Sequence, residues 1–101
     1  MKLEHTSVQK LKAEILEILG KHLDLSRHKV FFFGSRVSGR ANASSDIDIG
    51  IEGPNPISHK VLSNIEDEIN ALPILYKIEI VDFKRVSHEF REVALQRIES
   101  L

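Results

Sequence analysis

Apolar residues recur along the chain with two different periods, and these periods predict alternating helices and strands. Apolar spacings of three to four residues, each preceded by a serine that can cap a helix, predict helices at residues 8–20, 59–72 and 88–101. β-branched, aromatic and alternating runs predict strands at residues 29–33, 46–52 and 76–83. The last helix is expected to carry an apolar stripe of Phe90, Val93, Ala94, Ile98 and Leu101. This order predicts an α/β fold: a small mixed sheet of about three strands flanked by helices.

Length and composition narrow the class of protein. A chain of 101 residues with 42% hydrophobic and 29% charged residues is expected to form one domain over residues 1–101. A net charge of -1 argues against direct nucleic-acid binding, which normally needs a basic face. The absence of cysteine excludes disulfides and thiolate chemistry. No apolar run is long enough to span a membrane and no signal peptide is evident, so a cytoplasmic protein is expected.

Two carboxylates interrupt the isoleucines of the predicted strand 46–52. Strict alternation places Asp46 and Asp48 on one face of this strand, about 6 to 7 Å apart between their Cα atoms. An Asp-x-Asp pair can simply face water at a strand edge. Inside a core strand, however, two like charges are stable only with a bound cation between them, and Mg²⁺ fits hard oxygen ligands best. Glu79 would complete a carboxylate cluster if its strand pairs beside the strand 46–52.

The strand 29–33 is followed directly by Gly34 and Ser35. Gly34 permits a tight turn and the close approach of a ligand, and Ser35 with the free N–H groups of a short following helix can hold a phosphate. The same Gly-Ser pair taken alone is usually only a turn. Arg36 is a nearby cation, for which a phosphate contact and a surface role both remain open. With phosphates at this turn and metal ions on the carboxylates, the natural reaction is in-line displacement at phosphorus.

These residues carry a family resemblance. Gly34-Ser35 and Asp46-x-Asp48 match, residue for residue, the Gly-Ser…Asp-x-Asp motif of the nucleotidyltransferase superfamily that includes DNA polymerase β and kanamycin nucleotidyltransferase. Over residues 7–98 the chain resembles the minimal nucleotidyltransferases (MNT) of HEPN/MNT toxin–antitoxin pairs. The resemblance implies a nucleotidyltransferase fold, ATP as the donor and a two-metal Mg²⁺ site.

The resemblance also assigns roles to residues. It implies that Asp46, Asp48 and a third carboxylate bind metal and act in catalysis, and that Gly34, Ser35 and Arg36 bind the nucleotide together with the two aspartates. The third carboxylate of the family is usually an aspartate on a later strand, where this chain offers Glu79 or Asp82. Glu79 is preferred, because the matching family segment has its acid before an aliphatic pair and a second aspartate.

The function implied is transfer of AMP from ATP to a hydroxyl of a partner protein. The partner would be a helical HEPN-type toxin, with this chain as its antitoxin. Two alternatives remain open at this stage. The chain can be a non-catalytic, nucleotide-binding antitoxin that occludes a HEPN toxin, or the catalytic subunit of a small-molecule nucleotidyltransferase whose substrate-binding subunit is separate.

Overall fold

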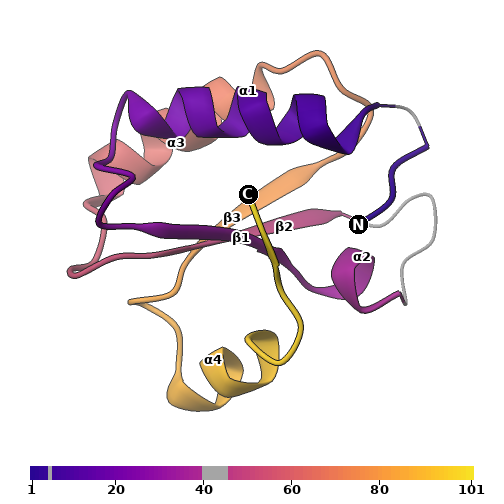
Figure 1. The fold of residues 1–101 in the computed structure, drawn as a ribbon. Helices are drawn as coiled ribbons and strands as arrows, with labels where there is room; N and C mark the ends of the chain where they lie inside the picture. Colours follow the sequence, from indigo (N-terminus) through magenta and orange to yellow (C-terminus); the bar gives the residue numbers. More distant parts are fainter. Residues whose placement is uncertain (5, 40–45) are drawn as a thin grey trace.

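A four-stranded mixed sheet lies at the centre of the molecule (Figure 1). The computed structural model describes residues 1–4, 6–39 and 46–101. Its elements in chain order are α1 (Val8–Gly20), β1 (Lys29–Phe33), α2 (Ser35–Ser38), β2 (Ile47–Glu52), α3 (His59–Asn70), β3 (Ile78–Asp82), α4 (His88–Ala94) and β4 (Glu99–Ser100). The strand order is β3-β2-β1-β4, with β1 antiparallel to both neighbours and β2 parallel to β3. The α/β class is therefore confirmed, with one strand more than expected.

The three longer helices begin where the serines predicted. The hydroxyl oxygens of Ser7, Ser58 and Ser87 each accept a hydrogen bond from the backbone N–H three residues on, at 3.1 to 3.3 Å. Such caps satisfy one of the N–H groups that a helix leaves without an internal acceptor, and each is worth about 1 kcal/mol. Within the described ranges, no helix is long and apolar enough to cross a lipid bilayer.

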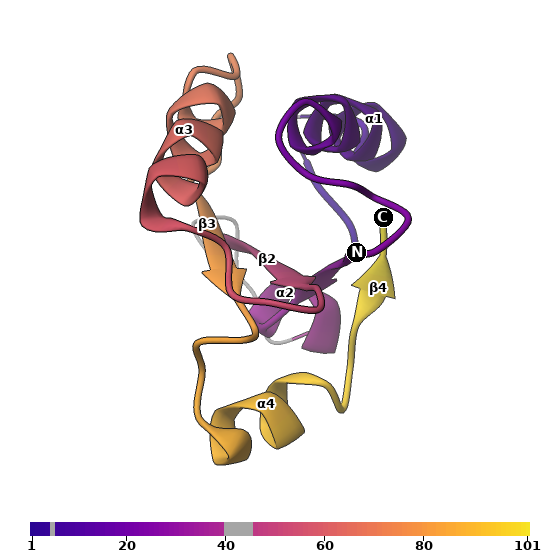
Figure 2. The same ribbon diagram turned by 90° about the vertical axis from the view of Figure 1, so that its left-hand side faces the viewer.

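Helices cover the sheet on both faces, α1 and α3 on one side and α4 on the other (Figure 2). The alternation of β2 decides which side chains face which layer. Ile47, Ile49 and Ile51 are fully buried and belong to the core cluster that includes apolar residues of α1 and α3. The intervening positions of β2, which include Asp48 and Gly50, therefore lie on the α4 side.

A second, smaller core lies on the α4 side of the sheet. The rings of Phe31 and Phe83 meet edge to face with centroids 4.9 Å apart, and Phe33 meets Phe83 at 5.1 Å. Such aromatic pairs contribute about 0.5 to 1.5 kcal/mol beyond the area they bury. This cluster supports the surface on which the predicted catalytic carboxylates lie.

Gly50 gives a stability prediction, because it lies directly under these rings. A Cβ atom at this position would lie 2.7 Å from Phe83 Cε1 and 2.6 Å from Phe31 Cζ. We expect Gly50→Ala to lower the free energy of unfolding by about 1 to 3 kcal/mol through overpacking, measured by urea denaturation. Gly20→Ala at the end of α1 is the control, because the added Cβ meets Leu25 Cδ1 at 3.5 Å, an ordinary van der Waals distance. Equal stability of the two variants would contradict this packing.

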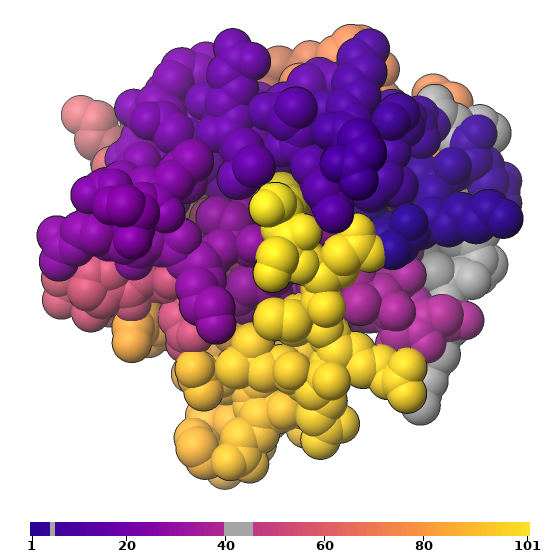
Figure 3. Space-filling view, in the orientation of Figure 1, coloured from indigo at the N-terminus to yellow at the C-terminus, as the bar shows by residue number. Residues whose placement is uncertain are grey.

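The C-terminal segment corrects the sequence-based prediction. The last helix ends at Ala94 rather than at residue 101, and Glu99–Ser100 forms the edge strand β4 beside β1. The Glu99 carboxylate forms ion pairs with the N-terminal amine and with Lys12 Nζ, the latter at 2.9 Å. The Leu101 N–H donates a hydrogen bond to Val30 O at 3.1 Å. Figure 3 shows this yellow segment against the indigo N-terminal region. These long-range contacts favour a strand at Glu99–Ser100, although the local apolar spacing alone predicts that the helix continues.

The outer face of α4 also differs from the expected apolar stripe. Phe90 is 43% exposed and Val93 is 69% exposed, whereas Ala94 and Ile98 pack against the phenylalanine cluster. The helix therefore buries one edge against the sheet and presents two large apolar side chains on its surface. This exposed part of α4 borders the candidate site described below.

An ion pair connects α4 to β2 of the sheet. From this ion pair we predict that the stability of the protein depends on pH in the acid range. Arg91 Nε and Nη2 donate to the two carboxylate oxygens of Glu52 at 2.6 and 2.9 Å, and this bidentate contact lowers the pKa of Glu52. Because the folded-state pKa is depressed, the stabilisation is complete above about pH 4.3, the ordinary glutamate value. It is lost as the pH falls through the lower folded-state pKa.

We expect Glu52→Gln to lower the Tm at neutral pH and to weaken the acid-induced loss of Tm relative to the wild type. Tm measured across the acid range checks this. Glu66→Gln on the exposed surface of α3 is the control and should leave the wild-type profile unchanged. Parallel acid profiles for Glu52→Gln and the wild type would contradict the assigned role of the pair.

Candidate active site

The pairing of β2 with β3 brings two of the predicted carboxylates together. In the parallel register, Asp48 lies beside Glu79, and in the antiparallel pairing Asp48 lies opposite Phe33, the last residue of β1. Asp46 directly precedes β2 and has the same parity as Asp48. The pairing on which the proximity of Glu79 depended is therefore present, and these carboxylate residues lie at the end of the sheet where β1 leads into α2.

Asp82 lies on the opposite face of β3 and has a different environment. Its side chain is buried, and its carboxylate oxygens accept hydrogen bonds from Ile57 N–H at 2.8 Å and Lys84 N–H at 2.9 Å. Arg85 Nε lies 3.5 Å from the same carboxylate. Asp82 thus holds the loop before α3 against the end of β3, whereas Glu79 alone of the two acids shares the face of Asp48.

The electrostatic environment of Asp48 is unfavourable for its charge. Its side chain is half-buried, and burial raises its pKa, with further increases from the nearby charges of Glu79 and Asp46. Glu79 itself is 47% exposed, and Lys77 Nζ lies 3.4 Å from one of its oxygens. A half-buried carboxylate with two acidic neighbours is stabilised by a cation placed between them.

The donor set fits Mg²⁺, although it is not a closed metal cage. Within the described parts of the chain, no three carboxylate or imidazole groups converge closely enough to hold a metal ion by themselves. Mg²⁺ is commonly held by only one or two carboxylates and completed by substrate phosphates and water. Asp46 and Asp48 supply such a pair of hard oxygen donors, and Glu79 adds a third carboxylate at the same edge.

The turn at Gly34 lies directly against Asp48. Gly34 has φ 82° and ψ −160°, a conformation open essentially only to glycine, and a Cβ atom here would collide with the Asp48 carboxylate. The Gly34 carbonyl accepts hydrogen bonds from Val37 N–H at 3.2 Å and Ser38 N–H at 3.1 Å, which close the turn of α2. Residues Ser35–Ser38 thus form the short helix on which the phosphate site depended, and the turn before it lies against the carboxylate of Asp48.

Arg36 is placed differently from the other predicted nucleotide-binding residues. Its guanidinium lies over the ring of Tyr76, with Cζ 4.6 Å from the ring centroid. The Tyr76 hydroxyl accepts a hydrogen bond from the N–H of Glu4 at 2.9 Å. This stacking ties α2 to the loop before β3. The sequence left open a phosphate contact and a surface role for Arg36. This stacking is compatible with both, so its contact with phosphate remains a prediction.

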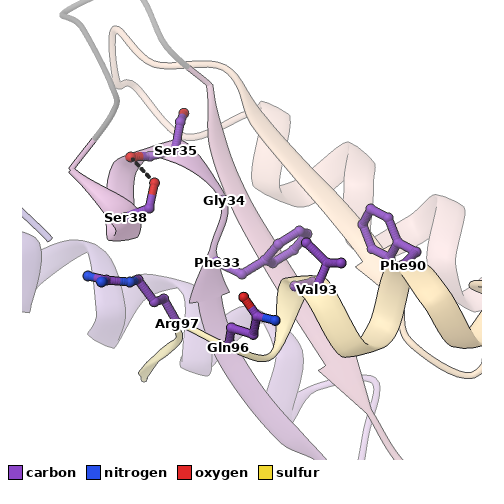
Figure 4. Close-up of a pocket in the computed structure, with 9 residues that line it drawn as sticks. Phe33, Gly34, Ser35, Ser38, Phe90, Val93, Gln96 and Arg97 are labelled. Carbon is purple, nitrogen blue, oxygen red and sulfur yellow. Dashed lines mark hydrogen bonds between the residues drawn. The ribbon is translucent and has the colours of Figure 1, made fainter.

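A cavity of about 390 Å³ opens between α2 and α4. Gly34, Ser35 and Ser38 line one side, and Figure 4 shows the facing side chains of Phe90, Val93, Gln96 and Arg97. These four residues were not predicted from the sequence to belong to the site. Phe90 and Val93 fitted a core stripe, and Gln96 and Arg97 carried no recognisable spacing signal. These four residues line the same cavity, and the sequence alone does not indicate that they come together.

A mixed sheet that carries an Asp-x-Asp pair beside a Gly-Ser turn is the arrangement expected of a nucleotidyltransferase fold. The model of the family described as polymerase beta, nucleotidyltransferase matches residues 13–101. This chain belongs to that family, and the family prediction made from the sequence is confirmed.

The relatives agree with this assignment. Over 85 residues the chain is 27% identical to "Probable protein adenylyltransferase MntA" of Haemophilus influenzae, covering 82% of this chain and 75% of that protein. A crystal structure of a toxin–antitoxin pair with AMP-PNP has a TM-score of 0.71 at 16% identity, covering 88% of this chain and 70% of the other. A tri-AMPylated Shewanella oneidensis HEPN toxin in complex with MNT antitoxin gives a TM-score of 0.68 at 14% identity, with 91% and 69% covered. The resemblance to minimal nucleotidyltransferases is thereby confirmed.

Proposed function

We propose that this chain is a Mg²⁺-dependent nucleotidyltransferase that moves AMP from ATP to a hydroxyl of a HEPN-type partner protein, acting in the cytoplasm as the antitoxin of a HEPN/MNT pair. The observation that carries the proposal is the contact of Gly34 with Asp48 beside Glu79. It joins a phosphate-binding turn to a carboxylate cluster on one face of the sheet. The likeness to MntA and to MNT–HEPN complexes supports the choice of a protein acceptor.

The residues divide the reaction between them. Asp46 and Asp48 would hold Mg²⁺, which when bound neutralises phosphate charge and favours the deprotonated acceptor hydroxyl. The backbone of Gly34 and the hydroxyl of Ser35 hold the phosphates of the donor. The acceptor oxygen attacks the α-phosphorus while the bond from that phosphorus to the bridging oxygen of the β-phosphate breaks. The acceptor proton passes to Glu79, and pyrophosphate leaves.

The experiment is intact-mass measurement of the HEPN-type protein of the native host after incubation with this chain and Mg·ATP. We expect the partner to gain the mass of one or more AMP residues, and to gain none with the Asp46→Asn/Asp48→Asn variant. Neutralisation of the partner without any mass gain would instead support the occluding, non-catalytic antitoxin. Modification of a small molecule by the same mixture would support the small-molecule transferase.

Glu79 and Asp82 give a matched pair of variants. We expect Glu79→Gln to lower the rate of AMP transfer about 100-fold or more through loss of a general base, with little effect on stability. Asp82→Asn should lower the free energy of unfolding by about 1 to 3 kcal/mol, because its amide cannot accept both backbone N–H bonds. The transfer rate per folded molecule should stay unchanged. Single-turnover rates together with urea denaturation check this, and the reverse pattern would assign the third carboxylate to Asp82.

A further inference from the structure

The cavity between α2 and α4 continues directly from the proposed phosphate-binding turn. Gly34 and Ser35, which are proposed to hold the donor phosphates, line the cavity at its α2 side. Its volume of about 390 Å³ lies within the range of small-molecule sites, which are largely apolar with a few placed polar groups. A nucleotide whose phosphates occupy the turn must direct its nucleoside somewhere nearby, and this cavity adjoins the turn at Gly34 and Ser35.

We propose that this cavity binds the nucleoside of the donor and selects adenine, with Phe90 and Gln96 as its specificity-determining residues. The proposal rests on the proposed function, because it assumes that phosphates occupy the Gly34–Ser35 turn. It goes beyond that function by assigning base recognition to α4 and the segment that follows it, in which no motif of the sequence indicated a site.

Phe90 supplies a surface on which a base can stack. Its ring packs against Phe33 and Phe83, with centroids 6.1 and 5.8 Å away, so neighbouring rings fix its orientation. The side chain nevertheless remains 43% exposed and lines the cavity. A large aromatic ring that is supported from behind and open in front is a stacking platform, and base stacking typically changes affinity about tenfold or more. Val93, 69% exposed, extends the same apolar wall.

Gln96 supplies the polar group that distinguishes bases. It lines the cavity just beyond α4, and Figure 4 shows its amide among the side chains that face α2. A side-chain amide presents an NH2 donor group beside a carbonyl acceptor, and these match the N7 acceptor and the N6 donor of adenine. Guanine presents two acceptors on the same edge and would leave the amide oxygen unpaired. Arg97 extends toward the α2 side of the cavity, where a cation complements the charge of the donor phosphates (Figure 4).

The test compares binding of Mg·ATP, Mg·GTP and Mg·tripolyphosphate by calorimetry, where tripolyphosphate probes the phosphate site alone. We expect Phe90→Ala and Gln96→Leu each to weaken ATP binding about tenfold and to leave tripolyphosphate binding unchanged, and Gln96→Leu to reduce the preference for ATP over GTP. Gln96 lies at an exposed position, so its variant tests the site even if Phe90→Ala disturbs the aromatic cluster. Leu75→Ala, which removes an 81% exposed apolar side chain outside the cavity lining, is the matched control.

Three outcomes would overturn the inference, and they are distinguishable. Wild-type ATP binding that neither cavity variant weakens would overturn the nucleoside site while leaving the proposed function intact. The same conclusion follows if the variants weaken only association with a partner protein, which would make the cavity a protein-docking surface. If the wild type binds neither Mg·ATP nor Mg·tripolyphosphate, the proposed function is overturned, and this inference with it.

Discussion

Asp48→Asn is expected to abolish AMP transfer and, at the same time, to raise the Tm of the metal-free protein. The asparagine keeps the size of the side chain but removes a proposed metal ligand, and metal ions supply several kcal/mol of transition-state stabilisation in such reactions. We therefore expect the transfer rate to fall by at least about 100-fold. The gain in Tm follows because burial, Glu79 and Asp46 all disfavour the charge of Asp48 and raise its pKa.

The control for this variant is Asp67→Asn on the exposed surface of α3, which removes the same charge away from the site. It should change neither the transfer rate nor the Tm. Tm is measured in the presence of a chelator, so that metal binding does not mask the repulsion among the carboxylates. An Asp48→Asn protein that retains transfer, or that unfolds at a lower temperature than the wild type, would contradict this description of the site.

Gly34→Ala is the second change with a large expected effect. Its backbone conformation, φ 82° and ψ −160°, costs a non-glycine residue about 1 to 3 kcal/mol, and the new Cβ would displace the Asp48 carboxylate. Both the proposed phosphate-binding turn and the proposed metal ligand Asp48 would therefore shift together. We expect transfer to fall about 100-fold or more, because displacement of reacting groups by about 1 Å can have an effect of that size.

The variant Gly39→Ala is a control that separates the effect of backbone strain at a positive φ from the effect of a collision between the new Cβ and the Asp48 carboxylate. Gly39 also has a positive φ, 81°, but no atom of the residues that the structure describes lies within 4 Å of the position that its Cβ would take. This variant should lose about 1 kcal/mol of stability and keep its transfer activity. Single-turnover transfer rates and urea denaturation of both variants check the prediction. Equal activity of Gly34→Ala and Gly39→Ala would mean that the contact between Gly34 and Asp48 has no role in the reaction.

Local chemistry explains why much of the fold could be predicted from the sequence. The serine caps fix three helix starts, and the period-two alternation of residues 46–52 separates the buried isoleucines from the carboxylates. The same parity argument places Glu79 beside Asp48 and Asp82 on the opposite face once β2 and β3 pair in parallel. These features depend on neighbours in the sequence or on one strand pairing.

The features that were missed depend on contacts between distant segments. The end of α4 and the strand β4 are set by Glu99 with the N-terminal amine and Lys12, and by the edge of β1. The position of Arg36 depends on Tyr76, which lies far along the chain. Neither hydrophobic spacing nor cap residues carry information about such partners. The prediction that residues 1–101 form a single domain remains a prediction.

The central claim is that AMP, rather than a terminal phosphate, is transferred to the acceptor. The most direct measurement uses two samples of ATP, one labelled at the α-phosphate and the other at the γ-phosphate, each incubated with Mg²⁺, the chain and its HEPN-type partner. We expect the α-label to become bound to the partner and the γ-label to leave in pyrophosphate, with no transfer by Asp46→Asn/Asp48→Asn. Attachment of the γ-label to the partner, or labelling that the double variant leaves unchanged, would contradict it.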